Sequence, residues 1–195
     1  MNINIDFMED QLLKKYTAYL DSLLENKSGE IFTNGGKEYA SELMSRLFNN
    51  TQKEARVYCE GFREDLIKTD PYWTSLKKYL EDPSKKLKVL VERAEHMKEE
   101  PIQLLLQTQK DRGDDTIQLR LIQKDDREYI ERRLADHDCN FAVFDDSMFR
   151  FEYDPDGFKA FGSFNDPRKC AILQQVFDKA FYRAEPLTMS GLPKS

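Results

Sequence analysis

The sequence predicts an α/β protein in which a mostly parallel sheet is flanked by helices on both faces. Short apolar runs of strand length alternate with segments of helical periodicity along most of the chain. Alternation of this kind is typical of parallel sheets whose strands are joined by crossover helices. The composition agrees, because 39% hydrophobic and 34% charged residues in a chain of 195 provide one core and a solvated surface. We therefore expect one ordinary folded domain.

The leading segment, residues 6–25, has the pattern of an amphipathic helix. Its apolar residues recur at spacings of three and four, which places them on one side of a helix. They are Phe7, Leu12, Leu13, Tyr16, Tyr19, Leu20, Leu23 and Leu24. This side covers either the core of the domain itself or the surface of a partner, and the sequence leaves both interpretations open.

Strands and helices then alternate up to residue 144. Strands are predicted at residues 30–33, 55–59, 86–92, 116–122 and 139–144, with helices between them at 39–48, 71–80, 101–113 and 125–136. Pro101 suits the first turn of a helix, where its missing N–H is not needed, and Gly113 suits a helix end. The last of these strands is almost continuously apolar, which indicates burial on both faces.

The C-terminal part changes pattern. Residues 148–153 and 158–164 are two β-rich runs around Asp154-Pro155-Asp156-Gly157, a turn sequence whose glycine tolerates a positive φ, so we predict a hairpin. Asp166 and Pro167 are a cap and a first residue for a final helix, which Pro186 ends. The predicted organisation is a helix over residues 1–27, an α/β domain over 28–186 and a flexible tail over 187–195.

Charge and cysteine content narrow the range of functions that the sequence allows. The formal net charge of −6 indicates an acidic surface that repels phosphate unless basic residues cluster, so nucleic-acid binding is not favoured. No apolar run approaches the roughly 18 residues of a membrane span, and the N-terminus lacks a signal pattern, so no membrane association is expected. Cys59, Cys139 and Cys170 form no CxxC motif, which favours reduced thiols in a cytoplasm.

No metal or other cofactor is expected. His137 and Cys139 would share one strand face as two ligands, but a zinc site needs a third and a fourth, and neither is apparent. Adjacent acids such as Asp145 and Asp146 are Mg²⁺ ligands in some proteins and solvated turn residues in most, and we expect the second role.

The C-terminal third carries a known motif in altered form. Residues 138–145, Asp-Cys-Asn-Phe-Ala-Val-Phe-Asp, followed after the hairpin by Gly162-Ser163-Phe164-Asn165, resemble the HxKxxxxD signature and the downstream GSxN of the phospholipase D superfamily. Residues 30–185 also have the element order of one half of such an enzyme. The resemblance implies a phospholipase D-like fold in which Asp138 stands at the catalytic His position and Asn140 at the Lys position.

These two replacements remove the chemistry that the resemblance implies. In this family a histidine attacks a phosphodiester, while a lysine and an asparagine hold the phosphate oxygens. Asp138 would repel the anion, and Asn140 offers a neutral dipole where a positive charge is needed. His137 is the alternative nucleophile, but a shift of one residue along a strand turns a side chain to the opposite face unless a bulge intervenes. We therefore expect no catalytic residues at this degenerate site.

The positions that do match the motif allow two interpretations. Asp145, Ser163 and Asn165 can each bond local backbone groups in turns, which is the structural interpretation that we favour. Alternatively, Asn140, Ser163 and Asn165 line a polar cleft that binds a phosphate-containing ligand without cleaving it. The hairpin between Asp145 and Gly162 exceeds the family's compact spacing, and we expect it to reshape or cover the site.

The function that these observations predict is binding without catalysis. The resemblance suggests an accessory module that binds another protein in a bacterial cytoplasmic system, with a defence or toxin-linked operon as its setting. Family members with one signature per chain pair across a two-fold axis, so the resemblance also implies a homodimer. The alternative is a phosphodiesterase or nuclease with a non-standard active site, which uses Asp138, Asp145 and a divalent metal, or His137 as nucleophile.

Overall fold

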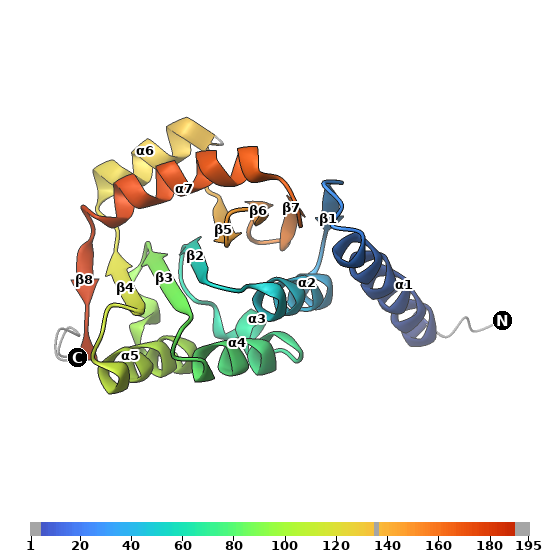
Figure 1. Cartoon of the computed structure of the whole chain (residues 1–195), viewed down its shortest axis with the longest axis horizontal. Helices are drawn as coiled ribbons and strands as arrows, with labels where there is room; N and C mark the ends of the chain where they lie inside the picture. The colour runs from blue at the N-terminus through green and yellow to red at the C-terminus, as the bar shows by residue number, and fades with distance from the viewer. Residues whose placement is uncertain (1–4, 135–136, 190–195) are drawn as a thin grey trace.

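One sheet of eight strands forms the centre of the molecule, and helices cover both of its faces (Figure 1). The structure is a computed structural model that describes residues 5–134 and 137–189. The strands are β1 (Phe32–Asn34), β2 (Glu54–Cys59), β3 (Lys86–Val91), β4 (Ile117–Leu121), β5 (Asn140–Phe144), β6 (Met148–Asp154), β7 (Lys159–Ser163) and β8 (Glu185–Leu187). Their order across the sheet is β1-β7-β6-β5-β2-β3-β4-β8.

The α/β class is confirmed, but the predicted strand direction is wrong for most of the sheet. Only the pairs β2–β3 and β3–β4 are parallel, and the other five pairs are antiparallel. The parallel pairs are the ones joined by crossover helices, as expected. β5 lies beside β2, on the side away from β3, and is antiparallel to it. The sequence alternates strands and helices in the same way whichever side of β2 the strand β5 joins, so the alternation does not predict this direction.

Two helical layers enclose the sheet (Figure 1). One layer contains α2 (Lys37–Asn50), α3 (Glu64–Ile67), α4 (Tyr72–Glu81), the 3₁₀ helix η1 (Ala94–Lys98) and α5 (Glu100–Arg112). The other contains α6 (Lys124–Leu134) and α7 (Pro167–Phe181), while α1 (Ile5–Glu25) extends from the edge near β1. Elements α3, η1 and β8 were not predicted, because three to five residues are too few for a periodic pattern.

Helix ends follow the predicted signals where side chains or special backbone angles set them. Pro101 lies in the first turn of α5, and Gly113 ends that helix at a left-handed φ of 64°. The carboxylate of Asp166 caps α7 by accepting from the backbone N–H of Lys169 at 3.0 Å. The predicted end of the helix 125–136 falls on residues 135 and 136, which lie outside the described residues.

The two faces of the sheet bury separate apolar clusters. The cluster on the α2 side includes Leu43, Leu47, Val89 and Ile102, and the cluster under α7 includes Phe141, Val143, Phe149, Phe177 and Phe181. Among the α1 residues whose side chains the structure describes, Leu20 and Leu23 of the second half are buried in a core. The helix is therefore partly intramolecular, as one of the two interpretations held. No helix in the described ranges combines the length and apolar character that a bilayer span requires.

Part of the chain beyond the final helix belongs to the sheet. Leu187 is buried and pairs with Leu119, so β8 becomes an antiparallel edge strand beside β4. The predicted tail over 187–195 thus begins within a strand, and its residues 190–195 lie outside the described residues. A three-residue edge strand gives little sequence signal, because its pairing depends on the position of β4 in the folded sheet.

The thiols are expected to be inert in the folded protein. Cys59, Cys139 and Cys170 are free and buried. Burial raises the pKa of Cys139 and of Cys170 to about 12, and raises that of Cys59 well above its ordinary value. A pKa higher by three units lowers the thiolate fraction near pH 8 by about a thousandfold. Iodoacetamide labelling followed by mass spectrometry should therefore be far slower for native protein than for protein in guanidinium chloride. Equal labelling rates in the two states would contradict this.

Candidate functional site

The segment that resembles the phospholipase D signature lies at the start of β5. Asp138 precedes the strand, its side chain is 70% exposed, and it forms an ion pair with Arg127 at 2.7 Å. Asn140 is the first residue of β5 and pairs in register with Glu152 of β6. The two positions where the family has histidine and lysine thus carry an exposed, already paired carboxylate and a neutral amide.

Asn140 connects three parts of the chain. Its side-chain oxygen accepts from the backbone N–H of Glu60, just past β2, at 3.0 Å. Its side-chain nitrogen donates to Oε2 of Glu152 at 2.7 Å. With both ends of the amide engaged, Asn140 fixes the end of β2 against β6 and has little capacity left for a ligand.

A buried ion pair stands beside Asn140. Nη2 of Arg150 donates to Oε1 of Glu152 at 2.6 Å, and both side chains are only 6% exposed. Nε of Arg150 also donates to Asn34 of β1 at 3.3 Å, and the Asn34 amide donates to the carbonyl of Phe158 at 2.6 Å. We call Asn34, Asn140, Arg150 and Glu152 the buried polar network. It joins β1, β5, β6 and the β6–β7 turn.

Sequence analysis missed Arg150 and Glu152, although a signal for them was present. Both interrupt an otherwise apolar strand at a spacing of two, which places them on the same face of β6. Charged residues on a buried strand face are rarely tolerated unless they are paired. Such a pair therefore indicates a constructed polar site even before a structure is available.

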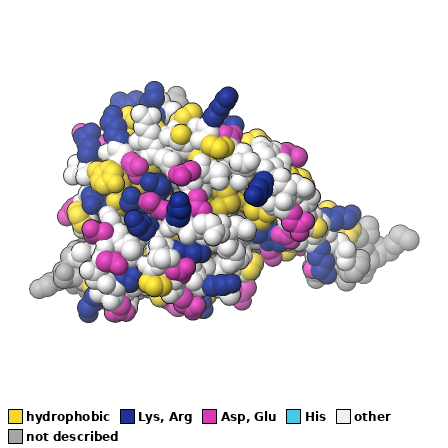
Figure 2. All heavy atoms as spheres, in the orientation of Figure 1, with side chains coloured by type: hydrophobic (Ala, Val, Ile, Leu, Met, Phe, Trp, Pro, Cys, Tyr) yellow, Lys and Arg dark blue, Asp and Glu magenta, His cyan; other side chains and the backbone are white. Residues whose placement is uncertain are grey.

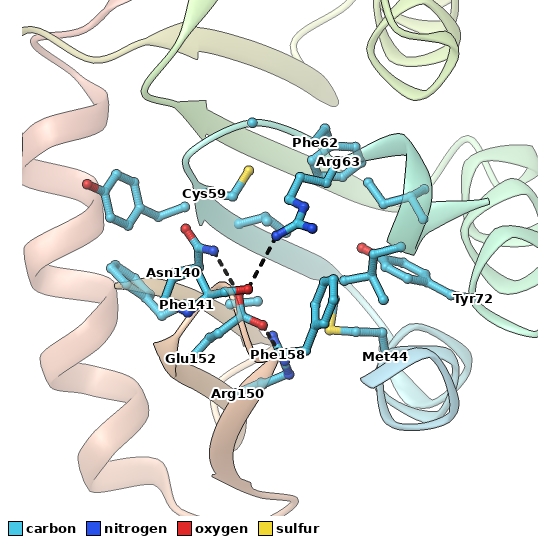
Figure 3. Close-up of a pocket in the computed structure, with 17 residues that line it drawn as sticks. Met44, Cys59, Phe62, Arg63, Tyr72, Asn140, Phe141, Arg150, Glu152 and Phe158 are labelled. Carbon is cyan, nitrogen blue, oxygen red and sulfur yellow. Dashed lines mark hydrogen bonds and ion pairs between the residues drawn. The ribbon is translucent and has the colours of Figure 1, made fainter. Parts of the chain in front are cut away.

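Aromatic and cationic side chains close the small pocket beside this network (Figure 3). The guanidinium of Arg63 lies over the ring of Phe158, 4.5 Å from its centroid, and donates to the carbonyl of Pro155 at 3.3 Å. Tyr72, which is 3% exposed, forms another part of the wall. The cavity volume is about 60 Å³, which is enough for a few water molecules.

A second cleft of about 190 Å³ opens next to Asp138 and is rich in acids. Its charged lining residues are Glu60, Glu92, Arg93, Arg127, Asp138 and Asp156. Arg127 contacts Glu92 at 3.1 Å, Glu131 at 2.8 Å and Asp138 at 2.7 Å, and these carboxylates raise its pKa. Arg93 pairs with Glu60 at 2.7 Å. Both arginines of the cleft are therefore already neutralised by neighbouring carboxylates.

Glu92 is a carboxylate of this cleft whose pKa is raised by its surroundings. Burial raises its pKa above the ordinary value, whereas the hydroxyl of Tyr58, which donates to Oε1, and the nearby Arg127 lower it. The same carboxylate, together with burial, raises the pKa of Tyr58. Perturbed carboxylates occur at functional sites and in structural networks alike. Here Glu92 is fully engaged, with Tyr58 on one oxygen and Arg127 on the other.

Ser163 and Asn165 do not join Asn140. Ser163 pairs with Phe149, which pairs with Val143, and Val143 is three residues from Asn140 on β5. An odd spacing along a strand places side chains on opposite faces, so Ser163 faces α7 while Asn140 faces the α2 layer. The expected cleft formed by Asn140, Ser163 and Asn165 is therefore not assembled.

The GSxN segment instead has local structural contacts. Oγ of Ser163 accepts from the N–H of Asn165 at 3.1 Å, and the Asn165 amide donates to the carbonyl of Lys27 at 2.9 Å. A Cβ on Gly162 would lie 2.2 Å from the carbonyl oxygen of Phe149 and 2.6 Å from the ring of Phe32. The glycine allows β7 and the Phe32 ring to approach this closely.

Asp145 lies at the other end of β5, separated from Asn140 by about 16 Å of extended strand. Its carboxylate accepts from the backbone N–H groups of Gln52, Lys53 and Glu54 at 2.7, 2.8 and 3.1 Å. Asp138 and Asp145 therefore cannot share one metal ion. Among the described residues, no group of three or more His, Cys, Asp or Glu side chains is placed to hold a metal.

His137 is exposed, and its Nε2 lies 3.2 Å from the carbonyl oxygen of Tyr153. Cys139, two residues further, is buried at 2% exposure. The two side chains thus occupy different environments, one in solvent and one in the cluster under α7. In the described part of the chain, the hydrogen-bond partner of His137 is the Tyr153 carbonyl oxygen, so no base or anion-binding group is placed to activate it as a nucleophile.

The fold is similar to that of several solved structures, although the sequence itself matches no protein-family model and no curated protein. TrmBL2, an archaeal chromatin protein whose structure shows a novel mode of DNA binding, aligns with 93% of this chain and 66% of its own, at 16% identity and a TM-score of 0.60. Nuc, a phospholipase D family member from Salmonella typhimurium, aligns with 82% of this chain and 99% of its own, at 10% identity and a TM-score of 0.52.

Phosphatidylserine synthase from Haemophilus influenzae gives a similar result. It aligns with 85% of this chain and 41% of its own, at 13% identity and a TM-score of 0.53. The chain thus spans about two thirds of the archaeal protein and less than half of the synthase. Identities this low establish the fold alone. The chain has a phospholipase D-like α/β fold, as the motif resemblance predicted.

Proposed function

We propose that this chain is a non-catalytic phospholipase D-like module that acts by binding another protein. The observation that carries the proposal is the buried Glu152 carboxylate, which occupies the position beside Asn140 together with Arg150. Asp138, just before β5, pairs with Arg127 at 2.7 Å. The arginines next to these carboxylates are thus already bound to protein groups, Arg150 to Glu152 and Arg127 to Asp138, and are not left to bind a phosphodiester.

The cover of the pocket supports the same conclusion. The Arg63 guanidinium lies over the Phe158 ring, 4.5 Å from its centroid, and both side chains line the pocket. The hairpin supplies this cover, since Phe158 lies in the turn between β6 and β7. The segment that lengthens the motif is therefore the segment that fills the site.

A DNA-associated role is the second candidate, favoured by the likeness to the chromatin protein TrmBL2. The charge of this chain weighs against direct binding by the domain. On the face shown in Figure 2, lysine and arginine side chains are interspersed with aspartate and glutamate, and the net charge is −6. In this second role the chain would bind DNA-associated proteins and would not contact the DNA phosphates directly. A bacterial cytoplasmic setting linked to defence or toxin systems stays a prediction.

Turnover and binding assays test both candidates. Purified protein is incubated with bis-p-nitrophenyl phosphate and with single- and double-stranded DNA and RNA, with and without Mg²⁺. We expect no hydrolysis above the level of Asp138→Ala and His137→Ala variants prepared identically, because neither residue is positioned for attack on phosphorus. Turnover that either substitution abolishes would show an enzyme with a non-standard site. Binding of DNA without cleavage, weakening steeply with salt, would favour direct DNA association instead.

A further inference from the structure

The face of the sheet under α7 carries an apolar groove that is separate from the motif cleft. It lies where the end of α6 and the first half of α7 meet β6 and β7, and its volume is about 150 Å³. The lining side chains are Leu134, Phe149, Phe151, Phe161, Lys169, Ile172 and Leu173, and we call this site the α7 groove. Apolar cavities of about this volume that are lined by Leu, Ile and Phe bind molecules the size of benzene. The α7 groove therefore fits one aromatic or branched side chain of a partner.

The walls of the α7 groove are exposed, although its floor is buried. Phe149 and Phe151 form part of the floor and are buried, whereas Ile172 on the wall is 54% exposed. Phe161 stacks against Tyr153, which is 42% exposed, with the two ring centroids 6.3 Å apart. Single exposed apolar residues are ordinary, but apolar residues that are contiguous around a hollow mark interaction sites. The apolar surface here continues from α7 to the β6–β7 hairpin.

Helix α7 places basic side chains along this groove, although the chain as a whole is acidic. Lys169 lines the groove and pairs with Asp166 at 2.5 Å. Arg168 and Lys179 lie four residues before and seven residues after Ile172, so they share its side of the helix. Three cations of α7 thus flank the exposed isoleucine.

The end of α6 adds a further cation. The two helices contact each other on this face of the sheet (Figure 1), and Lys179 lies over the ring of Tyr129 on α6, 4.0 Å from its centroid. Arg133 follows Tyr129 by one turn, so it lies on the same side of α6, next to the lining residue Leu134. Arg133 and Arg168 are exposed, and in the described part of the chain neither forms an ion pair, whereas other cations of these helices do.

We propose that the α7 groove binds an acidic peptide segment of a partner protein, with one bulky apolar side chain inserted between α7 and the hairpin. This rests on the proposed protein-binding function and specifies the chemistry of the partner. Carboxylates on either side of the inserted residue would lie against Arg133, Arg168 and Lys169, which gives the complex complementary charge. A nucleic acid fits less well, because the lining side chains other than Lys169 are apolar and offer base edges no hydrogen bonds.

Selection from a random peptide library tests this chemistry without assuming a sequence. A phage-displayed library is selected on the purified wild-type chain, and the enriched peptides are sequenced. We expect aspartate and glutamate to be enriched around a single phenylalanine, tryptophan, leucine or isoleucine. Enrichment of basic or uncharged peptides, or no enrichment at all, would overturn the proposal.

Fluorescence anisotropy with the most frequently selected peptide locates its binding site. Ile172→Glu should weaken binding roughly tenfold or more, because it places a carboxylate on the apolar wall. Leu12→Glu is the matched control, since Leu12 on α1 is 52% exposed and does not line the groove. Arg168→Glu should weaken binding about fivefold at low salt and less at high salt. Lys110→Glu makes the same charge change on an exposed residue of α5, in the other helical layer, and should leave binding unchanged.

The failure of this proposal is distinguishable from the failure of the proposed function. Equal peptide affinity of wild type and Ile172→Glu would refute the α7 groove as the site and leave the binding function intact. Phosphodiester hydrolysis in the assays above would refute the non-catalytic function, whatever the peptide result. Phosphatidylglycerol vesicles and double-stranded DNA are tested in parallel. Binding of either that Ile172→Glu abolishes would show a different occupant and overturn the proposal.

Discussion

Arg150→Met is expected to lower the free energy of unfolding by about 3–5 kcal/mol, because it leaves the Glu152 carboxylate buried without its counter-charge. Asn140 keeps its hydrogen bond to Glu152, but a neutral amide cannot replace a guanidinium 2.6 Å away. Chemical denaturation of wild type and variant, monitored by far-UV circular dichroism, measures the difference.

Two further variants show whether the uncompensated charge is the cause. Arg150→Met combined with Glu152→Leu should be more stable than Arg150→Met alone, since no buried charge is left unpaired. Lys159→Met removes one partner of an exposed ion pair on the same hairpin, with Asp154 at 3.0 Å, and should leave stability almost unchanged. If Arg150→Met lowers the free energy of unfolding no more than Lys159→Met does, the buried polar network does not stabilise this part of the fold.

Gly162→Ala is the second substitution with a large expected effect, about 3 kcal/mol of destabilisation. The new Cβ would meet the Phe149 carbonyl oxygen at 2.2 Å and the Phe32 ring at 2.6 Å. A ring can move aside, but the carbonyl belongs to the backbone of β6, so the β6–β7 pairing itself must shift. Thermal and denaturant unfolding of the purified variant gives the measurement.

Gly113→Ala is the matched control for this glycine. Gly113 ends α5 with a φ of 64°, and nothing lies within 4 Å of its added Cβ. The expected cost is only that of a left-handed alanine, about 1 kcal/mol. If Gly162→Ala costs no more than Gly113→Ala, the close approach of β7 to β6 and Phe32 does not restrict this position. The motif glycine would then have to be explained in another way.

Both large predictions concern residues at or beside the motif segment, and both give these residues a structural role. Gly162 accommodates Phe32, Asn165 holds the end of α1 through Lys27, and Asp145 caps the backbone before β2. These contacts give a structural reason for three motif residues in a site with neither the histidine nor the lysine. They also agree with a module that kept the fold and uses its surface for binding.

Local signals in the sequence determined much of this protein. Periodicity located α1, α2, α4, α5 and α7, Asp166-Pro167 marked a helix start, and the turn after Asp154 predicted the β6–β7 hairpin. The motif around Asp138 predicted the phospholipase D-like fold. Each of these signals acts over a few neighbouring residues, so it can be read without knowing what packs against it.

Only the tertiary structure decided which strands pair and which motif residues meet. The entry of β5 against β2 made the sheet mostly antiparallel, and strand register placed Glu152 beside Asn140 while it sent Ser163 to the other face. The burial of Leu20 and Leu23 of α1 likewise depends on where α2 lies. Pairing and burial are set by contacts between residues far apart in the chain, and the same alternating pattern is compatible with more than one such arrangement.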